Sequence, residues 1–137
     1  MKPKSKCRKA PGYRSGAAVV EFAVCLPVII LIVLGSIEGA SMLFLRQALI
    51  QSAYEGAKVA VRNTGTNEDA ITAIENVAAG RHINELSIEF SPADISEAAQ
   101  GEFVTVTISA PGDSNSFIPF GPFKDRVVSA RAVMVKE

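Results

Sequence analysis

The sequence predicts an α+β protein with a long N-terminal transmembrane helix. Three observations lead to this fold class: an apolar stretch follows a basic N-terminus, a shorter segment has helical periodicity, and three later runs have the alternation of β-strands. We expect a helix that crosses the membrane and continues outside it, then a short helix and a small antiparallel sheet.

Residues 1–16 form a basic leader. Six Lys or Arg side chains and no acid precede Gly16. Such a cluster beside apolar residues resists translocation, so we expect a cytoplasmic N-terminus and an extracytoplasmic C-terminal domain. All 14 acidic residues but only 8 of the 14 basic ones follow Gly16, and this acidic exterior argues against nucleic acid as a partner.

The apolar stretch is long enough to cross a membrane once. Residues 22–45 carry one charge, Glu38, and as a helix they would extend roughly 36 Å, against a hydrocarbon core of about 30 Å. A secretory signal peptide has a shorter apolar run of about 7–15 residues, and Glu38 disfavours cleavage at the small residues that follow it. We therefore predict a single-pass transmembrane helix over residues 17–45, in the inner (cytoplasmic) membrane.

Glu21 lies at the start of this span, where an ionised carboxylate is costly. Cleavage between Gly16 and Ala17 would create an α-ammonium four residues before Glu21, on the same helix face. That charge would neutralise the carboxylate within one chain or between neighbouring chains. The alternative is that Glu21 lies in the headgroup region, where acids are tolerated.

Within the span, one proline and two glycines indicate contacts with other helices. Pro27 removes a helical hydrogen bond and predicts a kink that neighbouring helices compensate. Gly35 and Gly39 form a small-xxx-small step, repeated by Ser36 and Ala40, which allows close approach of a second helix. We therefore predict a helix–helix contact at Gly35 and Gly39.

The helix is expected to continue outside the membrane over residues 46–62. Small residues recur there at three- and four-residue steps and form a stripe along one face: Ala53, Gly56, Ala57 and Ala60. Glu38 lies two turns before Arg46. It is expected either to pair with Arg46 of a neighbouring chain or, as we favour, to reach the membrane interface.

Residues 63–137 are expected to form a small α+β domain. A stop signal at residues 63–65 ends the first helix, and Thr66 with Asp69 predicts the N-cap of a second helix that ends at Gly80. Three strands follow, over residues 86–90, 103–108 and 126–135. The loop before the last strand contains three phenylalanines, which we assign to the core rather than to an exposed binding patch: Phe117, Phe120 and Phe123.

The sequence contains no recognisable active site. His82, at the end of the short helix, has no second His or external Cys at ligand spacing. Cys7 lies in the leader and Cys25 in the span, so neither belongs to a disulfide framework. Phosphate-binding loops, nucleophile elbows and metalloprotease helices are missing from the sequence. We predict no catalytic residues, no metal and no cofactor.

The string RSGAAVVEFA at residues 14–23, followed by Pro27 and an Ile/Leu/Val run, resembles the N-terminus of TadE-like proteins, the pilin-like components of tight-adherence (Flp-type) pilus systems. The resemblance covers about residues 14–62, and residues 128–134 resemble the last strand of that family. It implies a pilin-like fold and cleavage by a prepilin peptidase, a membrane aspartic protease. Gly16 would be the last leader residue and Ala17 the mature N-terminus, and the resemblance implies peptidase recognition or subunit packing for two further residues, Glu21 and Phe22.

The leading hypothesis is a pseudopilin, made as a precursor and cleaved after Gly16. Its expected partners are the prepilin peptidase, other pilin-like subunits, the inner-membrane pilus assembly platform and membrane lipid. The runner-up is an uncleaved single-span accessory protein whose extracytoplasmic domain binds a partner. An enzyme tethered by the span comes third, because no site for it is recognisable.

Overall fold

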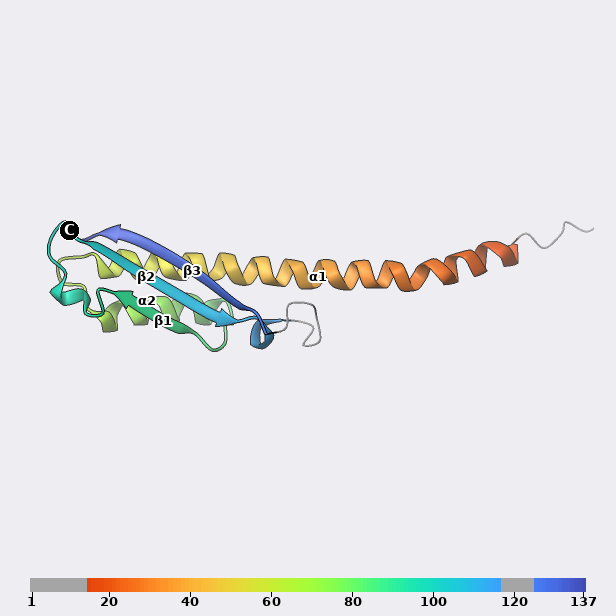
Figure 1. Ribbon diagram of the computed structural model, residues 1–137. Coiled ribbons are helices and arrows are strands. Elements are labelled where there is room, and N and C mark those ends of the chain that lie inside the picture. Colours follow the sequence, from red (N-terminus) through yellow and green to blue (C-terminus); the bar gives the residue numbers. More distant parts are fainter. Residues whose placement is uncertain (1–14, 117–124) are drawn as a thin grey trace, which may run out of the picture. The chain divides into compact units, whose positions relative to one another are not determined.

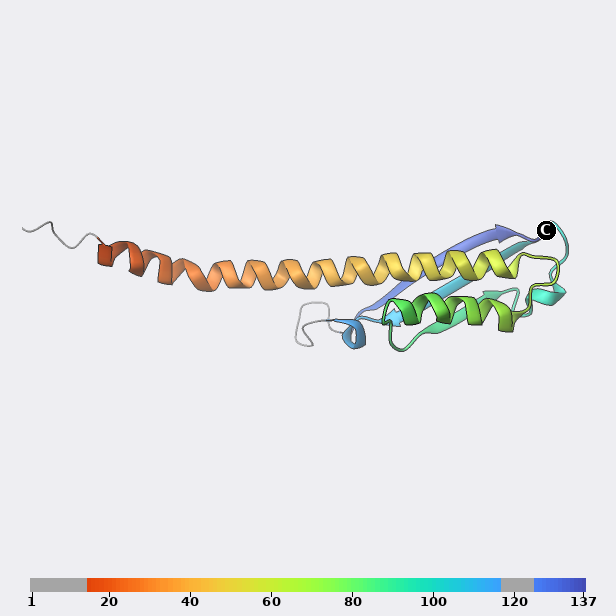
Figure 2. The same ribbon diagram turned by 180° about the vertical axis from the view of Figure 1, so that it is seen from behind.

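The computed structural model describes residues 15–116 and 125–137 (Figures 1 and 2). Its elements, in chain order, are α1 (Ser15–Ala60), α2 (Asn67–Gly80), β1 (Ser87–Ser91), the 3-10 helix η1 (Ile95–Glu97), β2 (Phe103–Pro111), the 3-10 helix η2 (Asp113–Asn115) and β3 (Val127–Val135). The predicted α+β fold class is confirmed. By its internal contacts the chain divides into two units, residues 1–34 and 35–137, which are described separately.

The first unit contributes the beginning of α1. Every residue from Gly16 to Ile37 is exposed, and the helix continues through Pro27 without a break. These 22 residues correspond to roughly 33 Å of helix, which matches the thickness of a bilayer core. α1 is therefore a candidate membrane span by length and composition.

In the second unit, α2 lies beside the C-terminal part of α1 and a three-stranded sheet packs across them (Figures 1 and 2). The sheet has the order β1-β2-β3, and both pairs are antiparallel. In the central strand, Ile108 is opposite Ile88 on one side and Ala130 on the other. Side chains alternate between the two faces of a strand, so alternate residues of β2 point toward the helices.

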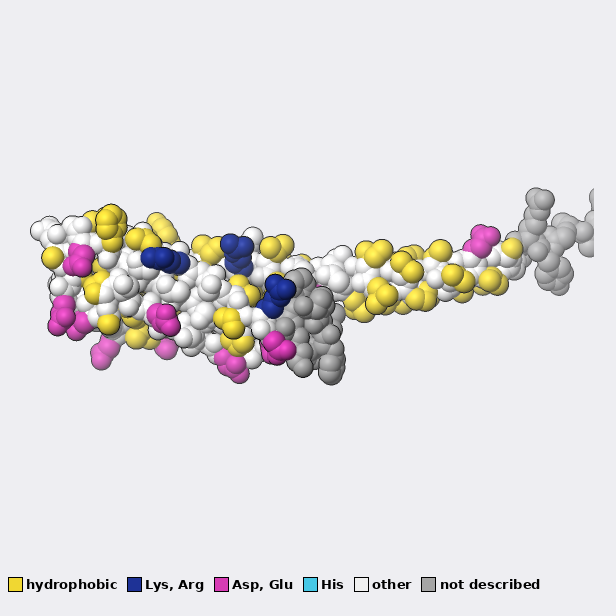
Figure 3. All heavy atoms as spheres, in the orientation of Figure 1, with side chains coloured by type: hydrophobic (Ala, Val, Ile, Leu, Met, Phe, Trp, Pro, Cys, Tyr) yellow, Lys and Arg dark blue, Asp and Glu magenta, His cyan; other side chains and the backbone are white. Residues whose placement is uncertain are grey.

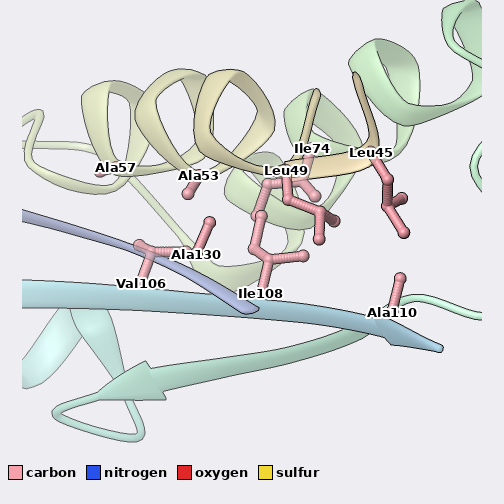
Figure 4. Close-up of a cluster of buried hydrophobic side chains, with 9 residues drawn as sticks. All are labelled: Leu45, Leu49, Ala53, Ala57, Ile74, Val106, Ile108, Ala110 and Ala130. Carbon is pink, nitrogen blue, oxygen red and sulfur yellow. The ribbon is translucent and has the colours of Figure 1, made fainter. Parts of the chain in front are cut away.

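The main core fills the space between the helices and the inner face of the sheet (Figure 4). Nine buried hydrophobic residues form it: Leu45, Leu49, Ala53, Ala57, Ile74, Val106, Ile108, Ala110 and Ala130. The small-residue stripe of α1 lets α2 approach closely, because a Cβ built on Gly56 would lie 2.4 Å from Ile74 Cγ1. The predicted stripe is thus an internal packing surface of this unit.

Backbone capping fixes the ends of the helices. The Thr66 hydroxyl accepts a hydrogen bond from the Asp69 amide, as the sequence predicts for the start of α2. Gly65 fits beneath the end of α1, where a Cβ would lie 2.4 Å from the Val59 carbonyl oxygen.

Hydrogen bonds from the Ser96 hydroxyl and amide to the Asp94 carboxylate, at the start of η1, hold the pKa of Asp94 below its usual value.

Lys136, directly after β3, is a buried cation that the sequence analysis did not identify. Its Nζ donates hydrogen bonds to the carbonyl oxygens of Ala60, at 3.3 Å, and Ile95, at 3.0 Å. The Ala60 carbonyl belongs to the last turn of α1, whose carbonyls have no partner within the helix. A lysine at a helix C-terminus also interacts favourably with the helix dipole. Lys136 therefore joins the end of the sheet to the end of α1.

The predicted elements agree with the observed ones apart from their boundaries. The strands begin within one residue of the predicted positions, but β2 extends three residues farther, to Pro111. The predictions for Cys7 and for the three phenylalanines of the β2–β3 connection lie outside the described residues.

Replacing Gly56 by Ala should destabilise the second unit. The added methyl group would overlap Ile74, a fully buried side chain, and overpacking of a core costs about 1–3 kcal/mol. Gly80→Ala is the matched control, since a Cβ there meets no atom within 4 Å. Thermal unfolding of the full chain in detergent, followed by circular dichroism, measures both. Equal stability of the two variants would contradict the close packing at Gly56.

Candidate functional site: the N-terminal part of α1

The Gly16–Ala17 bond lies in the first turn of α1. Both residues are exposed, and a Cβ built on Gly16 would meet no atom within 4 Å. The first turn of a helix has amide groups without helical partners, and glycine is a poor helix former. This bond is therefore accessible, and it lies in the part of the helix that unwinds most readily. A protease that binds its substrate as an extended chain needs both properties.

Glu21 and Phe22 follow one turn later, and both are exposed. Glu21 forms no ion pair with any described residue; within that part of the chain the one ion pair joins Lys58 and Glu55. Residues four apart on a helix lie on one face, with Cβ atoms about 5–6 Å apart. A charge on the nitrogen of Ala17 would thus lie within reach of the Glu21 carboxylate.

Pro27 lies within α1, at a position where it cannot donate to the carbonyl oxygen of Ala23. In an apolar environment that carbonyl needs another donor or a local distortion of the helix. The predicted kink at Pro27 and the helix–helix contact at Gly35 and Gly39 remain predictions. A Cβ built on either glycine would meet nothing within 4 Å, so that helix face is open.

Glu38 is buried, whereas the sequence predicts that its side chain reaches the membrane interface. Its side chain is 2% exposed, and Oε1 accepts a hydrogen bond of 2.5 Å from the Ser116 hydroxyl. The other oxygen, Oε2, is buried and has no hydrogen-bond partner in the described part of the chain. No local sequence pattern predicts this contact, because the two residues are 78 positions apart.

Two grooves adjoin α1 in the second unit. One, of about 840 Å³, lies between α1, the α2–β1 connection and η2, and the hydrogen-bonded pair Arg81 and Gln51 is close to it. The other, of about 510 Å³, lies between residues 39–46 of α1 and residues 126–129 at the start of β3. We refer to the second as the arginine groove, because Arg46 and Arg126 both line it.

Metal binding finds no support in the residues that the structure describes. Within residues 15–116 and 125–137, no group of three or more His, Cys, Asp or Glu side chains could hold a metal ion. His82 lies two residues beyond α2 with a φ of 55°, and its amide donates to the Ala79 carbonyl at 3.1 Å. Its backbone thus helps to end the helix, and its side chain is exposed.

A comparison with protein-family models gives one match, to the family described as TadE-like protein, over residues 16–58. No curated protein and no solved structure matches the chain. The match begins at Gly16 and includes every site residue predicted from the sequence, from the Gly16–Ala17 bond to Gly39. It confirms the resemblance over these residues, does not reach residues 128–134, and indicates a protein associated with a tight-adherence pilus.

Removal of the Ser116 hydroxyl should destabilise the second unit because it leaves a buried carboxylate without its donor. We expect Ser116→Ala to lower the free energy of unfolding by about 1–3 kcal/mol. The double variant E38L/S116A should recover part of this loss, because an apolar pair leaves no unsatisfied group. Chemical denaturation of the full chain in detergent measures these effects, with the exposed Ser114→Ala as control. Equal effects of Ser116→Ala and Ser114→Ala would contradict the contact.

Proposed function

We propose that this chain, a TadE-like protein over residues 16–58, is a pilin-like subunit (pseudopilin) of a tight-adherence (Flp-type) pilus or a related secretion system. In this proposal it is made as a precursor and cleaved after Gly16. One observation carries the proposal: a basic leader ends at an exposed Gly16–Ala17 bond, and the apolar helix that follows is exposed up to Ile37. An apolar surface of this extent needs lipid or other helices around it.

The proposed topology follows from the charges. The basic leader stays in the cytoplasm, α1 crosses the inner membrane once, and the second unit lies on the extracytoplasmic side. The prepilin peptidase meets the leader junction at the cytoplasmic face. Other pilin-like subunits and the assembly platform then contact the exposed part of α1, with the open face at Gly35 and Gly39 as the point of closest approach.

Cleavage would also change the electrostatics of the helix start. Before cleavage, Glu21 has no ion-pair partner in the described residues. After cleavage, Ala17 carries an α-ammonium one turn before it, and opposite charges attract more strongly in an apolar environment than in water. In addition, a carboxylate close to a new helix N-terminus interacts favourably with the helix dipole. The cut would therefore make it easier to bury the start of α1 among other helices.

The N-terminal residue of the mature protein tests the proposal. The protein is extracted from membranes of cells that carry the pilus genes and their peptidase, and is analysed by intact mass and terminal sequencing. We expect a chain that begins at Ala17, and we expect Gly16→Leu to retain the leader because the bulky side chain occupies the position before the cut. Gly80→Ala, 64 positions along the chain from Gly16, should be processed normally.

Persistence of Met1 and the leader in the unsubstituted protein would reject the precursor model. The chain would then be the uncleaved single-span accessory protein, whose extracytoplasmic domain binds a partner. Normal processing of the Gly16→Leu variant would reject the assigned cleavage position and leave open a cut elsewhere.

Glu21→Ala should leave membrane insertion intact and impair processing or incorporation of the subunit. The substitution makes the span more apolar, so carbonate extraction should still find the protein in the membrane fraction. Glu21→Gln keeps the size and hydrogen-bonding capacity of the side chain and should show the same defect if charge is what matters. Glu75→Ala, an exposed acid on α2, is the control. Wild-type processing and assembly of the Glu21→Ala protein would show that the carboxylate is merely tolerated.

A further inference from the structure

We propose that the arginine groove binds the phosphate of an anionic phospholipid headgroup. Arg46 of α1 and Arg126 before β3 come from segments 80 positions apart and line the same groove of about 510 Å³. Both residues are exposed. Neither forms an ion pair or a side-chain hydrogen bond with any residue in the described ranges. The groove thus presents two guanidinium groups that have no partner among residues 15–116 and 125–137.

The charge around the groove makes this pair unusual. The chain after Gly16 carries 14 acidic and 8 basic residues, so unpaired arginines in it have many potential carboxylate partners. In the view of Figure 3 the Lys and Arg side chains lie over β3 and the adjoining part of α1, whereas most Asp and Glu side chains lie toward β1 and α2. Two cations that line one groove repel each other unless an anion lies between them.

The chemistry of the groove favours a phosphate. A guanidinium group presents its N–H donors in a planar fork that matches two phosphate oxygens, and arginine is less strongly hydrated than lysine. The other lining residues from α1 are Gly39, Met42 and Leu43. Leu43 is 63% exposed, and a Cβ on Gly39 would meet no atom within 4 Å. An open apolar surface beside two arginines fits an amphiphile better than a free inorganic ion.

The position of the groove along α1 identifies the source of the phosphate as lipid. The exposed apolar part of α1 ends at Ile37, and its 22 residues match a hydrocarbon core of about 30 Å. Arg46 follows nine residues later, roughly 13 Å farther along the helix, on the headgroup side of that core. The long side chain of arginine extends toward the interface while its methylene groups stay on apolar surface. This inference rests on the membrane span and does not depend on cleavage at Gly16.

Native mass spectrometry of the full chain in a non-ionic detergent tests the proposal. Phosphatidylglycerol and, separately, phosphatidylcholine are added, and the bound lipid is counted. We expect a preference for phosphatidylglycerol that falls about fivefold in Arg46→Gln or Arg126→Gln and about 30-fold in R46Q/R126Q, the scale of one basic side chain near an anionic surface. The matched control R62Q/R131Q removes two exposed arginines outside the groove and should retain the preference.

Each of the following results would overturn the proposal: unchanged phosphatidylglycerol binding by R46Q/R126Q, an equal loss in R62Q/R131Q, or full displacement of the lipid by millimolar inorganic phosphate. Loss of self-association in R46Q/R126Q without any change in lipid binding would also overturn it and would assign the groove to an acidic segment of a second copy. Circular dichroism of each variant verifies the fold. Lipid binding is measured with the leader present, so a failure here is distinguishable from a failure of processing.

Discussion

Close packing against the small-residue face of α1 is the constraint on which the second unit depends. Ala53, Gly56 and Ala57 leave room for α2 and the sheet to approach the helix. The larger side chains of the core come from all three parts: Leu45 and Leu49 of α1, Ile74 of α2, and Val106 and Ile108 of β2. The chain after α1 is too short to bury a large core of its own. The helix therefore supplies one wall of that core, and the sheet and α2 supply the others.

Two polar contacts, each with one buried charged side chain, join the C-terminal half of the chain to α1 at residues 22 positions apart. Lys136, after β3, bonds the Ala60 carbonyl, and Ser116, after η2, bonds the Glu38 carboxylate. The helix from Glu38 to Ala60 measures roughly 33 Å, and strands of nine residues such as β2 and β3 measure about 30 Å. The strand length thus matches the length of helix between the two ties. Because a buried polar group that loses its partner is costly, these contacts disfavour sliding of the sheet along the helix.

Local sequence signals predicted most of the fold. The span, the Thr66 cap, the end of α2 at Gly80 and the three strands each depend on residues close together in the chain. The features that sequence reasoning missed involve distant segments: Ser116 donates a hydrogen bond to Glu38, and Arg46 and Arg126 line one groove. No periodicity or motif in the sequence predicts such pairs, because they depend on how the sheet packs on the helix. For the same reason, the sequence predicts that Glu38, an isolated acid in an apolar stretch, reaches the interface, whereas the structure buries it against Ser116.

The part of α1 that belongs to the candidate site is exposed, whereas the part that packs in the core has a buried face. Up to Ile37 it is exposed throughout, so its surroundings come from outside this chain, whether lipid or other helices. Both surroundings are apolar, and in both the charge of Glu21 is costly without a counter-ion. A counter-ion supplied by the same chain, on the nitrogen of Ala17, would serve in either environment, whereas one supplied by lipid or water would be lost on leaving the membrane. If the chain is cleaved after Gly16 as proposed, an acid one turn after the cut would therefore allow one helix to occupy both environments.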